Sequence, residues 1–359
     1  MKFRIKQLDL YIIKKFLGTY FFAILLILAI IVMFDVNEKM DKFLAAPLKA
    51  TIFDYYVNYL PYMANQFSPL FTFIAVIFFT SKMAGNSEII AILSSGVSFK
   101  RLLVPYMVSA CIIAIFSFTL DAFGIPPANV KRINYQNTYI KNKAVDYGTN
   151  IQLKVAPGEI AYMSRFDNRG KSAYNFSLEK FEGKVLKSRL TASSAVYDTL
   201  YRWTVKNYMI RDFNGMKECI KEGTKLDTII PIEPRDFLIA PNDHEKMTTP
   251  DLHSYITRQK ERGVANIKEF EIEYHRRYAM TAAAFILTLI GMSLSSRKVK
   301  GGMGINIGIG LVLSFSYILF STVTSTFAIS GYTSPMVAMW IPNVVYLIIG
   351  IILYRKASK

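Results

Sequence analysis

Histidine and cysteine, which build most metal centres and many catalytic sites, are scarce in this sequence. Its 359 residues include three histidines and two cysteines. His244, His253 and His275 are scattered and lack the spacing of a metal site, so no bound metal is expected. Cys111 lies inside an apolar run and Cys219 in a long polar segment, and we therefore expect no disulfide between them.

Acidic residues are also few. The chain has 26 Asp and Glu against 43 Lys and Arg, which gives a formal net charge of +17. No motif of a nucleic-acid-binding module accompanies this excess, and no G-x-x-x-x-G-K-[ST] loop for ATP phosphates is present. Because 52% of the residues are hydrophobic, we interpret the basic excess as that of a membrane protein facing anionic lipid headgroups.

Six apolar runs approach or exceed the roughly 20 residues that cross a bilayer. They are Phe16–Phe34, Leu60–Thr80, Leu102–Phe123, Tyr278–Ser296, Ile305–Ser330 and Met336–Tyr354. The first run ends at Phe34 and Asp35 without a small-x-small cleavage site, so we predict a retained anchor helix rather than a signal peptide. Pro61 and Pro69 interrupt the outer end of the second run.

The charges between the runs indicate the topology. Basic residues precede the first run, follow the second and fourth, and end the chain, whereas Gly331–Pro335 carries no charge. This alternation fits the positive-inside rule for six helices with both termini in the cytoplasm. The long segment between the third and fourth runs then faces outward. We therefore divide the chain into helical residues 1–123, an outside domain at 124–248, and helical residues 249–359.

The outside segment has a strand-like pattern. Ile151–Val155, Tyr174–Leu178 and Tyr201–Ile210 alternate apolar and polar residues, and turn-forming clusters separate them. This predicts an all-β sandwich, barrel or jelly roll whose edges are either protected or used to add another strand.

The outside segment ends in helices. Thr249 and Pro250 predict a helix start, and this helix should end near Arg262 and Gly263. A second helix should begin near Asn266 and continue into the fourth run. We interpret its charges as a solvated stem; they are Glu269, Glu271, Glu273, Arg276 and Arg277.

A short amphipathic segment, Gly85–Arg101, separates the second and third runs. Asn86 or Ser87 can cap a helix, Glu88 falls in its first turn, and Gly96 can end it. Four residues supply an apolar face, namely Ile89, Ile90, Ile92 and Leu93. This helix either lies on the membrane surface or docks into a groove of a cytoplasmic partner, and its spacing alone leaves both interpretations open.

Three short stretches carry a resemblance to a known family. They are Leu8-Asp-Leu-Tyr-Ile, Asn86-Ser-Glu-Ile-Ile-Ala-Ile-Leu-Ser-Ser-Gly-Val-Ser and Ile125-Pro-Pro-Ala-Asn. Together they resemble the LptF/LptG family, the permease subunits of the lipopolysaccharide exporter of Gram-negative bacteria, and the first stretch is more similar to LptG. The resemblance covers essentially the whole chain. It implies six transmembrane helices with a β-jellyroll domain inserted on the periplasmic side of the inner membrane.

The resemblance also implies partners and sites. The segment after the second run would be a coupling helix that docks on a separate cytoplasmic ATPase dimer, which would hold the ATP and Mg²⁺; its residues would be Ser87, Glu88, Ile89, Ile92 and Gly96. Further partners would be a second permease and a single-span, LptC-like jellyroll protein. The first and fifth helices would form lateral gates, and Gly304-x-x-x-Gly308 fits close packing of the fifth.

Lipid phosphates in this family meet basic residues near the outer end of the first helix. Here Lys39 and Lys42 would take that role, but three acids lie among them: Asp35, Glu38 and Asp41. An ABC-type permease for another lipid or for a lipoprotein remains the alternative. A membrane enzyme would need paired carboxylates or a histidine at membrane depth, and only Asp121 lies near the end of a run.

Overall fold

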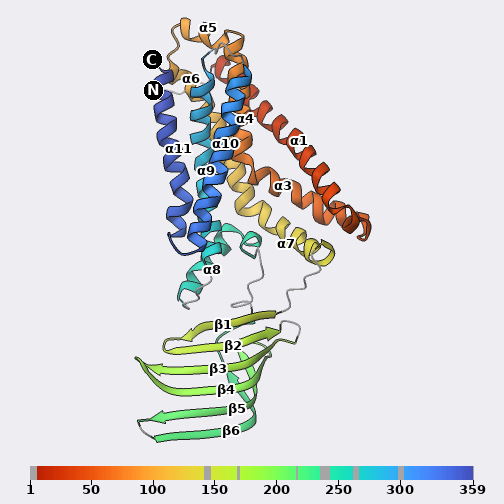
Figure 1. Ribbon diagram of the computed structural model, residues 1–359, viewed down its shortest axis with the longest axis vertical. Coiled ribbons are helices and arrows are strands. Elements are labelled where there is room, and N and C mark those ends of the chain that lie inside the picture. The colour runs from red at the N-terminus through yellow and green to blue at the C-terminus, as the bar shows by residue number, and fades with distance from the viewer. Residues whose placement is uncertain are drawn as a thin grey trace. The chain divides into compact units, whose positions relative to one another are not determined.

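The computed structural model describes residues 6–140, 147–167, 170–215, 217–234, 243–261, 267–297 and 303–358 (Figure 1). Two compact units make up the chain. A helical unit comprises Met1–Asn142, His244–Pro250 and Lys268–Lys359, and a sheet unit comprises Lys143–Asp243 and Asp251–Ile267. The predicted helix starts and ends at Arg262, Gly263 and Asn266 lie outside the described residues.

Six helices of the described residues are long and apolar enough to cross a membrane, in agreement with the six runs of the sequence. They are α1 (Gln7–Leu44), α4 (Ser68–Gly85), α6 (Phe99–Thr119), α9 (Lys268–Ser295), α10 (Met303–Ile329) and α11 (Pro335–Ala357). A helical membrane protein with an inserted β domain, the fold class that the sequence predicts, is confirmed.

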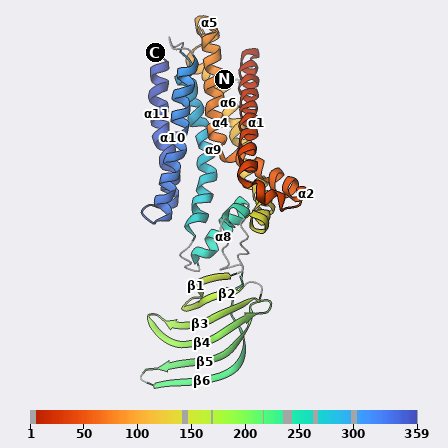
Figure 2. The ribbon, with the colours of Figure 1, turned by 45° about the vertical axis from the view of Figure 1, so that its right-hand side comes forward.

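Helices α4 and α9 lie at the centre of the helical unit. Helix α4 contacts α1, α9 and α10, while α9 also contacts α6 and α11; Figure 2 shows α4 between α1 and α10. Apolar side chains from these helices form one buried core, to which α4 contributes Phe71, Phe73 and Val76. Gly291 of α9 lies so close to α4 that an added Cβ atom would be 2.1 Å from Val76 Cγ1.

The second run is split into two helices. Helix α3 (Val57–Gln66) ends at Phe67 and α4 begins at Ser68, so the predicted span Leu60–Thr80 is wrong at its outer end. Pro69 explains the break, because its ring is compatible with the first turn of a helix but not with a helix interior. Before α3 come a short α2 (Leu48–Ala50) and a π-helical turn, η1 (Thr51–Tyr56).

The third run continues as helix beyond the predicted boundary. Helix α6 passes through a π-helical turn, η2 (Leu120–Gly124), into α7 (Ile125–Tyr135) and a further turn, η3 (Gln136–Ile140). These residues belong to the helical unit, whereas the sequence placed them in the outside domain from residue 124 onward. The returning chain forms η5 (Asp243–Lys246) and α8 (Thr249–Glu261), the latter where the sequence predicts a helix.

Six antiparallel strands form the sheet unit, and each pairs with the next in chain order. They are β1 (Tyr147–Ala156), β2 (Glu159–Asp167), β3 (Ser172–Glu182), β4 (Val185–Tyr197), β5 (Arg202–Asn214) and β6 (Lys217–Ile229). This order is a meander; the described strands have none of the crossover connections of a jelly roll. Their buried core centres on Trp203, which is fully buried beside Phe166 and Phe176 and donates from Nε1 to the carbonyl of Ile232.

A line of polar residues crosses the whole sheet, and we call it the polar crease. Its members are Asn150, Ser164, Asn175, Ser193, Asn207 and Thr224. At this line the ladder pairing is interrupted between every pair of neighbouring strands, yet the register is the same on both sides. The asparagines, in alternate strands, have left-handed backbone conformations with φ of 52°, 48° and 48°.

Apolar core residues show what the crease does to each strand. On either side of it they recur every second residue, as in any half-buried strand. Across it they are three residues apart, as are Val205 and Tyr208 in β5. Strands β2 to β5 therefore each have one extra residue at this line, and β1 and β6 follow them, because their register with β2 and β5 is the same on both sides. Hydroxyl groups bind carbonyls freed there, since Ser164 and Ser193 donate to the carbonyls of Tyr174 and Lys206, both at 3.1 Å.

We expect Asn207→Val to destabilise the sheet by about 1–3 kcal/mol, because a β-branched side chain is strained at positive φ. Asn207→Gly should cost less than about 1 kcal/mol, since glycine adopts this conformation freely. Thr224→Val, at an exposed crease position outside the left-handed region, is the matched control. Thermal unfolding of the purified chain in detergent measures the three, and equal losses for valine and glycine at position 207 would contradict the explanation.

Candidate functional site

The predicted coupling segment forms helix α5 (Glu88–Ser94) between α4 and α6. Ser87 precedes it in a left-handed conformation, with φ of 62°, and its side chain makes no capping hydrogen bond. Gly96 follows it with φ of 88°, a value that favours glycine. The two ends of α5 thus reverse the chain sharply on both sides of a helix of two turns.

The apolar residues of α5 divide between two faces. Ile89 is 1% exposed and Ile92 packs against the core of the helical unit. Ile90 and Leu93 point away from it, with 51% and 36% of their surface exposed. The continuous face of four that the sequence suggests is therefore wrong, because Ile89 and Ile92 pack against their own chain and only Ile90 and Leu93 stay exposed.

Glu88 lies at the start of α5 and is half-buried. Tyr11 of α1 donates its hydroxyl to one carboxylate oxygen and the Asn86 amide donates to the other, both at 3.2 Å. These donors are neutral, and in the described part of the chain no Lys, Arg or His forms an ion pair with Glu88. Two neutral donors thus orient the carboxylate, and no described basic side chain compensates it. Nearby, Asp9 of α1 pairs with Arg101 of α6 at 2.5 Å.

The outer end of α1 carries the two lysines assigned to lipid phosphate. Lys39 forms an ion pair with buried Asp35, and its side chain is 19% exposed. Its ammonium group lies against the rings of Tyr55 and Tyr59, 5.4 and 5.6 Å from their centroids. Burial, with the Asp35 charge, raises the pKa of Tyr55. Lys42 is exposed on the same helix. The two lysines thus differ, since Lys39 is largely enclosed and paired whereas Lys42 is exposed to solvent. Their role in binding lipid phosphate stays a prediction.

Gly304 and Gly308 of α10 face open space. A Cβ atom added to either would have no atom of the chain within 4 Å. Gly310 on the same helix is different, because its Cβ would lie 2.1 Å from Ile77 Cδ1 of α4. Close packing of α10 within this chain therefore occurs at Gly310, and the gate assigned to Gly304 and Gly308 stays a prediction about contacts with other molecules.

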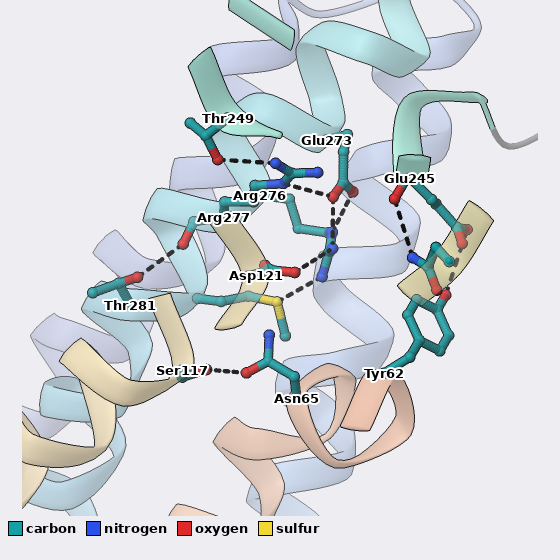
Figure 3. A network of polar contacts seen from close by, with 12 residues as sticks. Tyr62, Asn65, Ser117, Asp121, Glu245, Thr249, Glu273, Arg276, Arg277 and Thr281 are labelled. Atoms are coloured by element: carbon teal, nitrogen blue, oxygen red, sulfur yellow. Dashed lines mark hydrogen bonds and ion pairs between the residues drawn. The ribbon is translucent and has the colours of Figure 1, made fainter. Parts of the chain in front are cut away.

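A buried ion cluster lies where the helical unit gathers the two connections to the sheet (Figure 3). Three acids and three arginines form it, so its formal charge is balanced; they are Asp121, Glu245 and Glu273, with Arg132, Arg276 and Arg277. Asp121, Arg132, Glu273 and Arg277 are each at most 6% exposed. The solvated stem that the sequence predicts at Glu273 and Arg277 is therefore wrong.

Glu273 is the centre of the α9 side of this cluster. Its carboxylate accepts from Arg276 at 2.7 and 2.9 Å and from Arg277 at 3.0 Å. Arg276 also lies 3.7 Å from Asp121, which is held in the π-helical turn η2. Each guanidinium has an acid within reach, as buried charges require.

Glu245 is the centre of the other side. It pairs with Arg132 of α7 at 2.6 Å, and the Arg132 guanidinium stacks 3.9 Å from the ring centroid of Tyr62 in α3. The Tyr62 hydroxyl donates to Glu245 at 3.4 Å. Burial, together with the Glu245 charge, raises the pKa of Tyr62 to about 12, so this phenol stays neutral at physiological pH.

The sequence does contain a signal for this cluster. Glu273, Arg276 and Arg277 have the i, i+3 and i+4 spacing that places them on one face of a helix. Asp121, however, lies more than a hundred residues from Arg276, as Arg132 does from Glu245, and nothing local identifies these pairs. In the described residues no group of three or more His, Cys, Asp and Glu could hold a metal ion.

Comparison with known proteins gives one family that spans nearly the whole chain. The family model described as lipopolysaccharide export system permease LptF/LptG matches residues 10–356. The match extends from the first turns of α1 to the last turn of α11, and includes α5 and the inserted sheet. No curated protein matches the chain.

Proposed function

Since the chain belongs to the LptF/LptG family of lipopolysaccharide export permeases, we propose that it extracts lipopolysaccharide from the outer leaflet of the inner membrane and passes it to a periplasmic β-jellyroll bridge. As a member of this family it is a multi-pass inner-membrane protein and a non-catalytic component of its transporter. The main support for this proposal is the family match over residues 10–356. The six membrane helices, with a sheet inserted in the chain between the third and the fourth, agree with it.

Orientation follows from charge. With both termini in the cytoplasm, α5 faces the cytoplasm and the sheet unit the periplasm, as the positive-inside rule requires. Helix α5 then meets a separate ABC ATPase dimer, which binds ATP and Mg²⁺ and hydrolyses the nucleotide. Glu88 supports this role, because an oriented, uncompensated carboxylate attracts a basic groove, and the exposed Ile90 and Leu93 supply the apolar ridge of helix-in-groove recognition.

Two helices offer surfaces for a lipid cavity. Only 11% of the most apolar window of α1 and 22% of that of α10 is buried within the chain. A second permease, lipid tails and the helix of an LptC-like partner would cover these faces, and α1 and α10 would act as lateral gates. Closure of the ATPase dimer would move α5, narrow the cavity and drive the lipid outward, by a switch between two packings.

Strand β6 supports the handover to a bridge. It pairs with β5 on one side, is exposed along most of its length, and has no neighbour on its other side among the described strands. Such an edge offers free backbone donors and acceptors to a strand of a partner jellyroll. Another lipid or a lipoprotein cargo remains the alternative, and the transported lipid distinguishes the two.

The test is co-purification of the full chain with the ATPase and a second permease. We expect Glu88→Ala to weaken capture of the ATPase by roughly 10- to 100-fold, which corresponds to the roughly 1.5–3 kcal/mol of a charged hydrogen bond. Glu88→Lys should weaken it further by repulsion from a basic groove. Ser94→Ala, at the other end of α5, is the matched control. A wild-type chain that captures no ATPase, or Glu88 variants that bind normally, would contradict the assignment.

A further inference from the structure

The segment that leads from the helices to β1 and the segment that returns after β6 are fastened to each other. The chain leaves through α7 and η3 and returns at His244–Pro250. Arg132 of the outgoing α7 pairs with Glu245 of the returning segment at 2.6 Å. Asn129, one turn earlier on α7, donates to the Glu245 carbonyl at 3.1 Å. The side chain and the backbone of Glu245 are thus both held by the outgoing connection.

The returning segment is also fastened to α9. Arg277 donates to the Thr249 hydroxyl at 2.9 Å and to the Met247 carbonyl at 3.0 Å, while its third contact is Glu273. Figure 3 shows Arg277 between Thr249 and Glu273, with Glu245 and Tyr62 on the other side of the cluster. Three helices, α3, α7 and α9, therefore hold the returning segment at Glu245, Met247 and Thr249.

These contacts differ from the ion pairs of the sheet. Arg189 and Glu179, which pair between β3 and β4, have side chains that are 43% and 21% exposed, whereas those of Arg132 and Glu245 are 6% and 16% exposed. Here the charges are buried where the chain leaves for β1 and where it returns after β6, and a pair that is shielded from water is most sensitive to geometry.

The fastening is incomplete in its polar contacts. Asn129 Oδ1 and Arg132 Nε are buried without a hydrogen-bond partner in the described part of the chain. Unpaired buried groups are unfavourable and favour rearrangement towards a packing that satisfies them. The adjoining turn η2, which carries Asp121, is π-helical, and such turns within helices frequently occur at functional positions.

We propose that Arg132, Glu245 and Arg277, which we call the clamp, are positioning residues. They couple movement of α7 and α9 to both ends of the inserted sheet at once. Because outgoing and returning connections move as one clamp, a rearrangement of the bundle is delivered to the sheet as a single displacement rather than absorbed by two independent linkers. This inference rests on the proposed function. It assigns to the clamp the step that turns nucleotide-driven movement into lipid transfer.

The experiment uses the complete transporter, reconstituted in vesicles of phospholipid and lipopolysaccharide with its ATPase, second permease and jellyroll partner. ATP hydrolysis and lipopolysaccharide crosslinked to the jellyroll partner are measured together. Glu245→Gln and Arg132→Gln should leave hydrolysis within about twofold of wild type and lower lipid delivered per ATP at least fivefold. Arg132→Lys, which keeps the charge, should recover part of the delivery. Glu179→Gln is the control, because it breaks an ion pair away from the clamp.

The outcomes separate the two hypotheses. A wild-type complex that hydrolyses ATP but delivers no lipid overturns the proposed function, and the clamp with it. Normal delivery per ATP in both glutamine variants overturns the clamp alone. So does a parallel loss of hydrolysis, delivery and thermal stability, since that is the result of a purely structural role. If the charge variants fail to assemble, Asn129→Ala, which leaves every charge in place, must lower delivery per ATP or the clamp is wrong.

Discussion

Glu273→Leu should lower the free energy of unfolding of the chain by about 3–5 kcal/mol, the cost of removing one partner from a buried ion pair. Among the described residues, its loss leaves Arg277 without an acid and Arg276 with only Asp121, 3.7 Å away. The Arg277 side chain is 1% exposed and too deep to regain hydration, whereas that of Arg276 is 23% exposed, so the uncompensated desolvation cost falls mainly on Arg277.

Glu269→Leu makes the same change one turn earlier on α9, where the side chain is 52% exposed and its partner His244 lies 3.9 Å away. This control should cost less than about 1 kcal/mol, as exposed pairs do. Thermal and denaturant unfolding in detergent measures both variants. Equal effects would show that the cluster is hydrated in solution and contributes no more than a surface pair.

Gly291→Leu and Gly308→Leu should separate folding of the chain from its assembly. At Gly291 the new Cβ atom would meet Val76 Cγ1 at 2.1 Å and Phe73 at 3.2 Å, so α9 must move away from α4. We expect a loss of about 3 kcal/mol, at the upper end of the cost of overpacking. At Gly308 nothing of the chain lies within 4 Å, and the variant should unfold as wild type does.

The opposite order is expected for assembly. Gly308→Leu should weaken co-purification of the second permease or the LptC-like partner by at least tenfold, if α10 is a gate that packs closely against another molecule. Size-exclusion chromatography of the co-expressed complex measures this. Normal assembly of Gly308→Leu would remove Gly304 and Gly308 from the gate, and an unaltered unfolding transition of Gly291→Leu would contradict the tight α4–α9 contact.

Much of the fold could be predicted from hydrophobic pattern alone. Six runs of apolar residues specify six helices because a bilayer leaves a chain few alternatives, and alternation specifies strands such as Tyr174–Leu178. The break at Phe67 was harder to predict, because Pro61 and Pro69 both interrupt the run and only the second begins a helix. Local preference does not decide between the two prolines, because the position of the break also depends on how α3 packs against residues distant in sequence.

The sites show a sharper division. The position of α5 follows from its neighbours in sequence, so the place of Glu88 at its start could be predicted, while its coupling role stays a prediction. The burial of Glu273 could not, because it depends on Asp121 in η2 and on chain segments that return after the inserted sheet. A charged helix face is solvated by default, and only tertiary contacts remove it from water. Long-range electrostatic partners are what sequence reasoning missed in this chain.

The polar crease has a consequence for how the length of this sheet can change over evolution. A single-residue deletion at the crease in β4 would move every side chain beyond it to the opposite face of the sheet. The side chains of the neighbouring strands β3 and β5 would stay on their original faces. One such deletion could be accommodated only if the other five strands lost a residue at the same line. We therefore expect the six strands to change length together, and insertions to accumulate in the turns that join them.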